Sequence, residues 1–199
     1  MKKLAALLAT LGLATTVFAG DVEKGQQAAA ACAACHGADG NATLQPDYPK
    51  LAGQGAKYLE KQLHEFKSGA RDNAIMMGQA AGLNDEDIEN IAAFYASLEV
   101  QHAAVPAQYI ELGKKIYQAG NPSTSLPACT ACHGPTGIGV DAAGFPSLGG
   151  QNAQYTVAQL KAFKKGMRAN DNNRMMRDIA AKMTDEEIEA VAYYLVGLH

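Results

Sequence analysis

The feature that most constrains this chain is an internal repeat. A Cys-X-X-Cys-His-Gly unit at residues 32–37 returns at residues 129–134, 97 positions later. The same offset aligns many other identical pairs, including Pro49 with Pro146, Gln54 with Gln151, Tyr58 with Tyr155, Gln62 with Gln159, and Arg71 with Arg168. Self-similarity of this extent indicates a tandem duplication. We therefore expect two similar domains of fewer than 100 residues each.

The repeat also indicates where the domains end. After Arg71 and Arg168 the second copy gains three residues, and the offset becomes 100, so that Asp85, Ile88 and Leu98 match Asp185, Ile188 and Leu198. We expect a first domain at residues 20–99, a linker at residues 100–108 that contains Pro106, and a second domain at residues 109–199.

Each copy has the pattern of helices joined by long loops. Asn84 and Thr184 are favourable N-caps followed by acidic residues, and Thr184 with Glu187 matches a capping box. The segments that they begin, 85–98 and 185–198, place apolar residues on one face, which predicts core helices. We expect middle helices over residues 58–67 and 155–165 and short helices before each cysteine motif. Strand signals are weak, so the predicted fold class is all-α.

The first 19 residues have the layout of a secretory signal peptide. Lys2 and Lys3 precede an apolar stretch that ends at Val17-Phe18-Ala19, a small-residue cleavage site. The alternative, an uncleaved anchor, needs roughly 20 continuous apolar residues, whereas this apolar core is short. We predict cleavage after Ala19 and a soluble periplasmic protein. Cleavage removes two lysines and no acidic residue, so the net charge changes from -3 to -5. An acidic protein is poorly suited to bind nucleic acid.

All four cysteines belong to the two Cys-X-X-Cys-His units. Covalent attachment of haem needs two thiols, which add to the two vinyl groups, and an imidazole that ligates the iron from one side. We therefore predict two covalently bound c-type haems, attached through Cys32, Cys35, Cys129 and Cys132, with His36 and His133 as iron ligands.

The four cysteines have three other possible interpretations. A thioredoxin-like dithiol explains neither the histidine after each second cysteine nor the lack of a strand-helix-strand context. A four-cysteine zinc site leaves both histidines unexplained and is unusual in an exported protein. Two disulfides would be the ordinary interpretation for an exported chain, but they give the histidines no role either. Haem remains the prediction.

The sixth iron ligand is predicted from the repeat. Adjacent methionines stand in each copy, Met76 with Met77 and Met175 with Met176, and the offset of 100 aligns only Met76 with Met176. We predict these two as ligands, although methionines are more often core residues, and substitution by Met77 or Met175 stays open. Bis-histidine ligation is disfavoured because none of the remaining histidines, His64, His102 and His199, repeats.

Histidine with a thioether closes the iron and favours its ferrous state, which raises the reduction potential. Such an iron passes electrons and offers a substrate no open position. We therefore predict an electron carrier and no enzyme.

Further groups near each haem are less determined by the sequence. Pro49 and Pro146 follow the histidines by 13 residues, and a proline carbonyl there can accept the histidine Nδ1 hydrogen. Arg71 and Arg168, and the hydroxyls of Tyr58 and Tyr155, are candidates to hold propionates. Ordinary loop, surface or packing roles stay open for all six.

With these residues in view, the chain resembles the cytochrome c4 family of dihaem cytochromes over essentially its whole mature length. The motifs that carry the resemblance are residues 49–54, residues 145–151, the methionine pairs and the terminal residues 197–199. The resemblance implies two class I cytochrome c domains related by pseudo-twofold symmetry, with propionates close together at their interface. It also implies His36/Met76 and His133/Met176 ligation and a proline carbonyl bonded to each histidine. The short loop between Arg71 and Met76 departs from the family pattern.

The resemblance further implies electron transfer from respiratory complexes toward a terminal oxidase, near the inner membrane. We expect a monomer with redox proteins as partners. The alternative is the dihaem subunit of a flavocytochrome sulfide dehydrogenase, which requires a tightly bound flavoprotein. A dihaem peroxidase would need a labile iron and a longer chain, and a thiosulfate-oxidising cytochrome often uses a cysteine ligand that this chain lacks.

Overall fold

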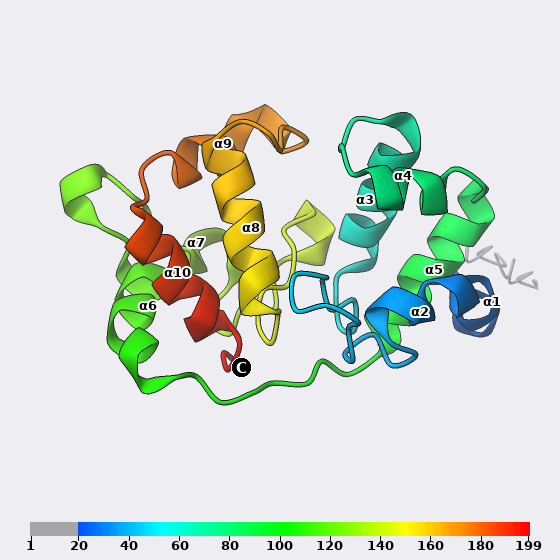
Figure 1. The fold of residues 1–199 in the computed structure, drawn as a ribbon, viewed down its shortest axis with the longest axis horizontal. Helices are drawn as coiled ribbons and strands as arrows, with labels where there is room; N and C mark the ends of the chain where they lie inside the picture. The colour runs from blue at the N-terminus through cyan, green and yellow to red at the C-terminus, as the bar shows by residue number, and fades with distance from the viewer. Residues whose placement is uncertain (1–19) are drawn as a thin grey trace, which may run out of the picture.

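The structure, a computed structural model, describes residues 20–199. The predicted signal peptide at residues 1–19 lies outside the described residues. Figure 1 shows two lobes side by side, with α1–α5 in one and α6–α10 in the other, joined by an extended segment along one edge. Within residues 20–199 the only strand-like pairings are two isolated bridges, so the all-α prediction is confirmed.

The two lobes repeat one order of helices. In the first lobe these are α1 (Val22–Ala28), α2 (Ala33–His36), α3 (Ala56–Ser68), α4 (Ala74–Ala80) and α5 (Asp85–Ser97). In the second they are α6 (Ala107–Ala119), α7 (Thr130–His133), α8 (Ala153–Lys164), α9 (Met175–Ala180) and α10 (Asp185–Leu195). Short 3₁₀ turns are interspersed at Ala29–Ala31, Pro122–Thr124, Asp141–Ala143 and Asn172–Arg174.

The first and last helices of each lobe cross at very short distance. A Cβ on Gly25 of α1 would lie 2.0 Å from the carbonyl oxygen of Asn90 in α5, and one on Gly113 of α6 would lie 2.4 Å from that of Ala190 in α10. Real Cβ atoms do not approach backbone so closely, so only glycine allows these crossings. The crossings therefore fix how the first and last helices of each lobe pack together.

The predicted core faces of α5 and α10 are confirmed. Ile88, Ile91, Ala92 and Tyr95 are at most 2% exposed, as are the residues at the matching positions of α10, Ile188, Val191, Ala192 and Leu195. Both helices begin with capping boxes, Asn84 with Asp87 and Thr184 with Glu187. Burial of each apolar side chain contributes on the order of 1.5–3 kcal/mol, so each lobe has its own core.

Two predicted boundaries near the linker differ from the structure. Helix α10 was expected to reach Leu198 but ends at Leu195, because the chain there turns against the linker: Ala103 donates its N–H to the carbonyl of Val196, and a Cβ on Gly197 would meet Val105 at 2.7 Å. Helix α6 begins at Ala107, inside the segment expected to be linker, with Pro106 as its N-cap.

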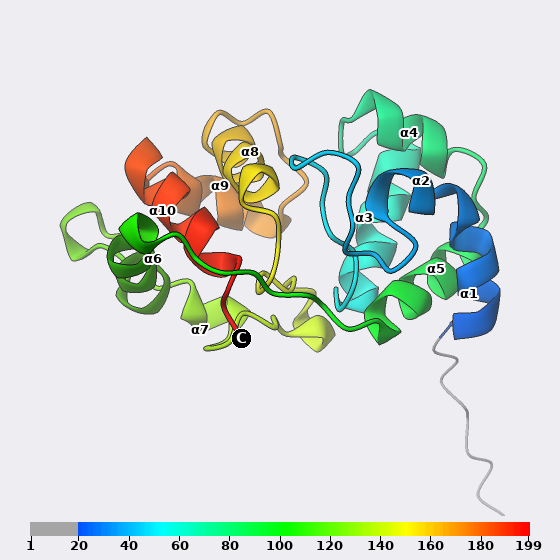
Figure 2. The same ribbon diagram turned by 60° about the horizontal axis from the view of Figure 1, so that its bottom comes forward.

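The linker runs along both lobes in the rotated view (Figure 2). Its residue Gln101 donates its N–H to Asn41 in the first lobe, and Lys50 donates its Nζ to the carbonyl of Gln101. On the other side Ala103 bonds to Val196 at the end of α10. The linker is therefore held by both lobes.

Candidate functional site

Each Cys-X-X-Cys-His unit forms one helical turn that ends at its histidine. Cys32 is the N-cap of α2 and Cys35 lies within that helix. Cys129 and Cys132 occupy the same places at α7. All four thiols are free. Because α2 and α7 lie in different lobes (Figure 1), the two cysteine pairs do not form a common four-thiolate cluster. Each pair instead presents two thiols on one turn beside an imidazole, which is the arrangement that covalent haem attachment needs.

The two histidines are buried and each is held by a proline carbonyl. His36 is 6% exposed with its Nδ1 2.9 Å from the Pro49 oxygen, and His133 is 8% exposed with its Nδ1 3.0 Å from the Pro146 oxygen. Burial lowers the pKa of both imidazoles, against a smaller opposite effect of the carbonyls. A neutral ring whose Nδ1–H donates to a carbonyl leaves Nε2 free to bind iron.

The two methionine pairs are placed alike. Met76 in α4 and Met176 in α9 are half-buried, whereas their neighbours Met77 and Met175 are each 37% exposed. Met183, which aligns with Leu83, is 4% exposed within the core of the second lobe. Of the unrepeated histidines, His64, His102 and His199 are all exposed.

The two arginines expected near the haem propionates meet where the lobes touch. Arg71 donates to Gln62 of its own lobe (2.8 Å) and across the interface to Tyr155 and Gln159 (both 3.0 Å). Arg168 reciprocates, donating to Gln159 (2.8 Å), Tyr58 (2.9 Å) and Gln62 (3.1 Å). This exchange of partners is what a pseudo-twofold relation between the lobes produces.

The arginine pair fits anionic groups of a cofactor. Both side chains are 9% exposed, and neither guanidinium has a carboxylate within ion-pair distance among residues 20–199. Each lies over an aromatic ring of its own lobe, Phe66 at 4.6 Å and Phe163 at 4.5 Å. Although burial raises the pKa of Tyr155, the two guanidinium groups bring it below its usual value. Two buried cations favour nearby negative charge, which haem propionates carry.

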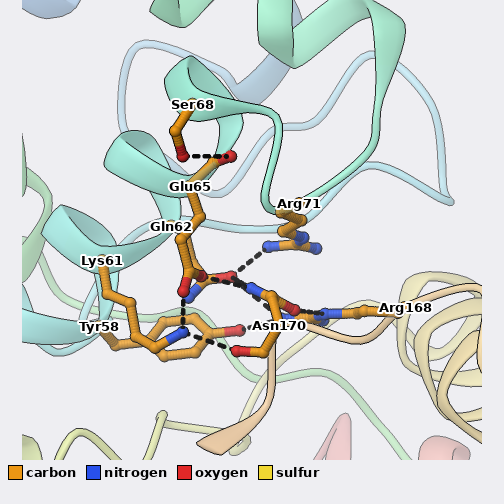
Figure 3. Close-up of polar contacts among 8 residues, drawn as sticks. All are labelled: Tyr58, Lys61, Gln62, Glu65, Ser68, Arg71, Arg168 and Asn170. Atoms are coloured by element: carbon orange, nitrogen blue, oxygen red, sulfur yellow. Dashed lines mark hydrogen bonds and ion pairs between the residues drawn. The ribbon is translucent and has the colours of Figure 1, made fainter.

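One part of the interface is not repeated and was missed by the sequence reasoning. Asn170, in the three-residue insertion, donates its Nδ2 to Gln62 (2.9 Å) and Glu65 (2.6 Å) on α3, while its carbonyl accepts from Lys61 (2.7 Å) (Figure 3). Lys61 and Glu65 also pair with each other. The positions that match these two in α8 are alanines, Ala158 and Ala162. The only signal for this contact was the insertion itself.

A second missed pair is Gln54 and Gln151. The repeat aligned them, but nothing in the sequence gave them a role. Both are buried, at 7% and 8% exposed, and both bond across the interface to backbone of the other lobe.

Two all-helical lobes, each with a proline-bound histidine at the end of a Cys-X-X-Cys turn, define a two-domain c-type cytochrome. The family model described as cytochrome c matches residues 22–99 and again residues 110–199. Over its full length the chain is 44% identical to cytochrome c4 of Pseudomonas aeruginosa, of which 99% is covered. The chain belongs to the cytochrome c4 family.

Two further comparisons agree with that assignment. A crystal structure of reduced recombinant cytochrome c4 from Pseudomonas stutzeri superimposes with a TM-score of 0.87 at 44% identity, covering 91% of this chain and all of that one. A protein of Stutzerimonas stutzeri named thiosulfate dehydrogenase electron acceptor is 44% identical over 86% of this chain and 80% of its own length. The predicted family, fold and pair of c-type haems are therefore confirmed, and the protein is an electron-transfer cytochrome with redox proteins as partners.

Proposed function

We propose that this cytochrome is a periplasmic electron carrier of a respiratory chain that delivers electrons toward a terminal oxidase and catalyses no reaction of its own. The observation that carries the proposal is the pair of buried histidines, each with Nδ1 occupied by a proline carbonyl. The methionine position that repeats in both copies of the sequence supports it. Haem supplies the one-electron couple when bound. Ligation of each iron by a histidine and a methionine would leave no position for a substrate, so that the haems would only exchange electrons.

The proposal assigns roles to particular residues. His36 with Met76 ligates the first iron, and His133 with Met176 the second. Pro49 and Pro146 orient the histidines. Arg71 and Arg168 bind propionates, with thioether attachment at Cys32, Cys35, Cys129 and Cys132.

Location and assembly are part of the same proposal. The leader at residues 1–19 directs export and is removed, leaving cytochrome domains at residues 20–99 and 109–199 with the linker 100–108 between them. Among residues 20–199 no helix is long and apolar enough to cross a membrane. We propose a monomer that associates with the inner membrane only peripherally.

A second candidate function is favoured by one observation. Relatives at 44% and 40% identity are named thiosulfate dehydrogenase electron acceptors, which supports direct acceptance of electrons from a periplasmic dehydrogenase. The dihaem subunit of a flavocytochrome sulfide dehydrogenase is a related alternative. Copurification of the native protein with a dehydrogenase or flavin-containing subunit would favour these readings over a free respiratory carrier.

The test is the visible spectrum of the reduced holoprotein before and after addition of carbon monoxide, with haem counted per chain in the same sample. We expect two haems and no spectral change, because both irons are closed. A rapid shift at either haem would reveal an open iron and overturn the carrier proposal in favour of an enzyme.

A further inference from the structure

We infer that Gln54 and Gln151 are reciprocal positioning residues, each holding the peptide group that orients the axial histidine of the other domain. This inference rests on the proposed ligand roles of His36 and His133 and deepens them. It adds a cross-domain connection between two haem sites that the sequence places in separate repeats.

The first half of the connection runs from Gln54 to the second haem site. The Oε1 atom of Gln54 accepts the N–H of Ser147 (2.8 Å), and its Nε2 donates to the carbonyl of Ser147 (3.0 Å). The N–H of Ser147 belongs to the same peptide group as the carbonyl of Pro146, which accepts the Nδ1–H of His133. Gln54 therefore bonds to one end of a peptide whose other end holds the histidine.

The second half repeats this pattern in the opposite direction. Gln151 accepts the N–H of Lys50 through Oε1 (2.8 Å) and donates Nε2 to the Lys50 carbonyl (2.9 Å). That N–H shares its peptide group with the carbonyl of Pro49, the acceptor for His36. Each amide thus uses both of its polar ends on backbone of the other domain.

Each glutamine is also fixed to its own domain. Oε1 of Gln54 accepts the N–H of Gly55, the N-cap of α3, at 3.0 Å, and Oε1 of Gln151 accepts the N–H of Asn152, the N-cap of α8, at 2.9 Å. Neither helix has a side-chain cap from its N-cap residue. The glutamines therefore join both domains, and loss of either leaves partly buried N–H groups without an acceptor.

The connection has a chemical consequence because hydrogen bonds through one peptide group are cooperative. An acceptor on the N–H increases the negative charge on the carbonyl oxygen of the same peptide. A stronger carbonyl acceptor makes the imidazole more basic and fixes its orientation. A more basic imidazole stabilises ferric iron, so docking of one domain influences the potential of the other domain's haem.

The test measures proton exchange by nuclear magnetic resonance in the reduced, ¹⁵N-labelled holoprotein. Gln54→Met keeps the side-chain length and removes both bonds to Ser147. We expect exchange of the Ser147 amide proton and the His133 Nδ1 proton to become about fivefold faster, since one hydrogen bond contributes about 1 kcal/mol. The Lys50 and His36 protons should stay unchanged, and Gln151→Met should give the mirror-image result.

Redox titration gives an independent readout. The separation between the two midpoint potentials should change in opposite senses in Gln54→Met and Gln151→Met. The exposed Gln26→Met is the matched control and should alter neither exchange nor potentials. If Gln54→Met does not yield holoprotein, Gln54→Asn serves instead, because it stays polar and withdraws the amide by one methylene.

Two outcomes would overturn the inference. One is no change in exchange in the other domain, and the second is equal acceleration at His36 and His133, which would mean that the interface merely loosens. The outcome is independent of the carbon monoxide experiment. An open iron would refute the carrier proposal, while crossed exchange effects would still establish the connection through the glutamines.

Discussion

The two domains share one haem-site frame but hold their methionine loops by different means. In the first domain four residues separate Arg71 from Met76, and Asn73 caps α4 by accepting the N–H of Met76 at 2.9 Å. In the second domain seven residues separate Arg168 from Met176, and the N-cap of α9, Arg174, makes no side-chain cap bond. The N-cap residue itself closes the first loop, whereas the N-cap residue of the longer loop does not.

The longer loop is held by one ion pair within the loop region and by one contact with the other domain. Asp171 pairs with Arg177 through Oδ1 and Nε at 2.7 Å and also accepts the Arg177 N–H at 2.9 Å. Asn170 beside it bonds to α3 of the first domain. Between Asp171 and Arg177 the backbone is strained, as the positive φ angles at Asn173 (51°) and Arg174 (61°) show. The second methionine loop therefore depends on domain docking, whereas the first is self-contained.

The largest expected effect comes from removing the methionines themselves. Met76→Ala should open the first iron and Met176→Ala the second, so each variant should bind carbon monoxide at one haem and keep a methionine-ligated spectrum at the other. Met77→Ala and Met175→Ala are the controls, since those side chains are more exposed. A normal spectrum in Met76→Ala or Met176→Ala would show that the neighbouring methionine takes over.

A second pair of variants tests the dependence of one loop on the other domain. Gly25→Ala and Gly113→Ala should each destabilise their own domain by about 3 kcal/mol, the upper end for overpacking, because the new Cβ meets backbone. Hydrogen exchange followed by mass spectrometry resolves the domains. Gly25→Ala should also loosen the second methionine loop, whereas Gly113→Ala should leave the first loop protected.

The control for these glycines is Gly78→Ala in α4, where a Cβ would meet nothing within 4 Å. It should be stabilising by about 0.5–1 kcal/mol, as alanine is preferred in helices. Equal loosening of both loops by Gly113→Ala would mean that the two loops depend on docking alike.

The next largest effect is expected from removing the ion pair between Asp171 and Arg177 in the second methionine loop. Asp171 is 4% exposed at its side chain, and Asp171→Ala should cost about 2 kcal/mol, mostly by leaving the Arg177 donors unpaired. The protection of α9 amides against exchange measures this loss. The exposed pair Arg174–Asp178 supplies the control, because Asp178→Ala removes a surface ion pair that contributes little.

The stability that Asp171 contributes should also depend on pH. Burial raises the pKa of Asp171, but the hydrogen bonds from Arg177 outweigh this and hold the pKa below its usual value. A carboxyl with a depressed folded pKa contributes stability above its unfolded pKa and loses it as the pH falls through the folded value. The difference between wild type and Asp171→Ala should therefore be full at pH 7 and decline below about pH 4. A pH-independent difference would exclude the charge as its source.

The internal repeat explains which residues the sequence could single out and which contacts it could not predict. Alignment of one copy with the other picked out His36, Met76 and their counterparts, since both copies repeat them at a fixed offset. Asn170 has no counterpart, so no alignment could assign it a partner. Gln54 was aligned, but its partner is the backbone of another domain, which no residue type encodes.

Helix boundaries show the same limit. The middle helices were expected from Tyr58 and Tyr155, yet α3 and α8 begin two residues earlier, at Ala56 and Ala153. Gly55, the N-cap of α3, has no side chain to mark the start, and Asn152, the N-cap of α8, is a favourable residue type that makes no cap bond here. The sequence predicted features that both copies repeat, such as the core faces of α5 and α10. It missed the hydrogen bonds that join one copy to the other.

The smallest predicted effect tests the claim that the first loop is self-contained. Asn73→Ala removes the cap of α4 and should cost about 1 kcal/mol, because the Met76 N–H loses its acceptor. Asn73→Ser keeps a capping oxygen and should restore most of the stability. Exchange of α4 amides should accelerate in the alanine variant alone, with α9 unchanged, since Asn170 and Asp171 hold that loop independently. Acceleration in α9 of similar size would mean that the first loop, too, is coupled to the domain interface, and the contrast between the two loops would fail.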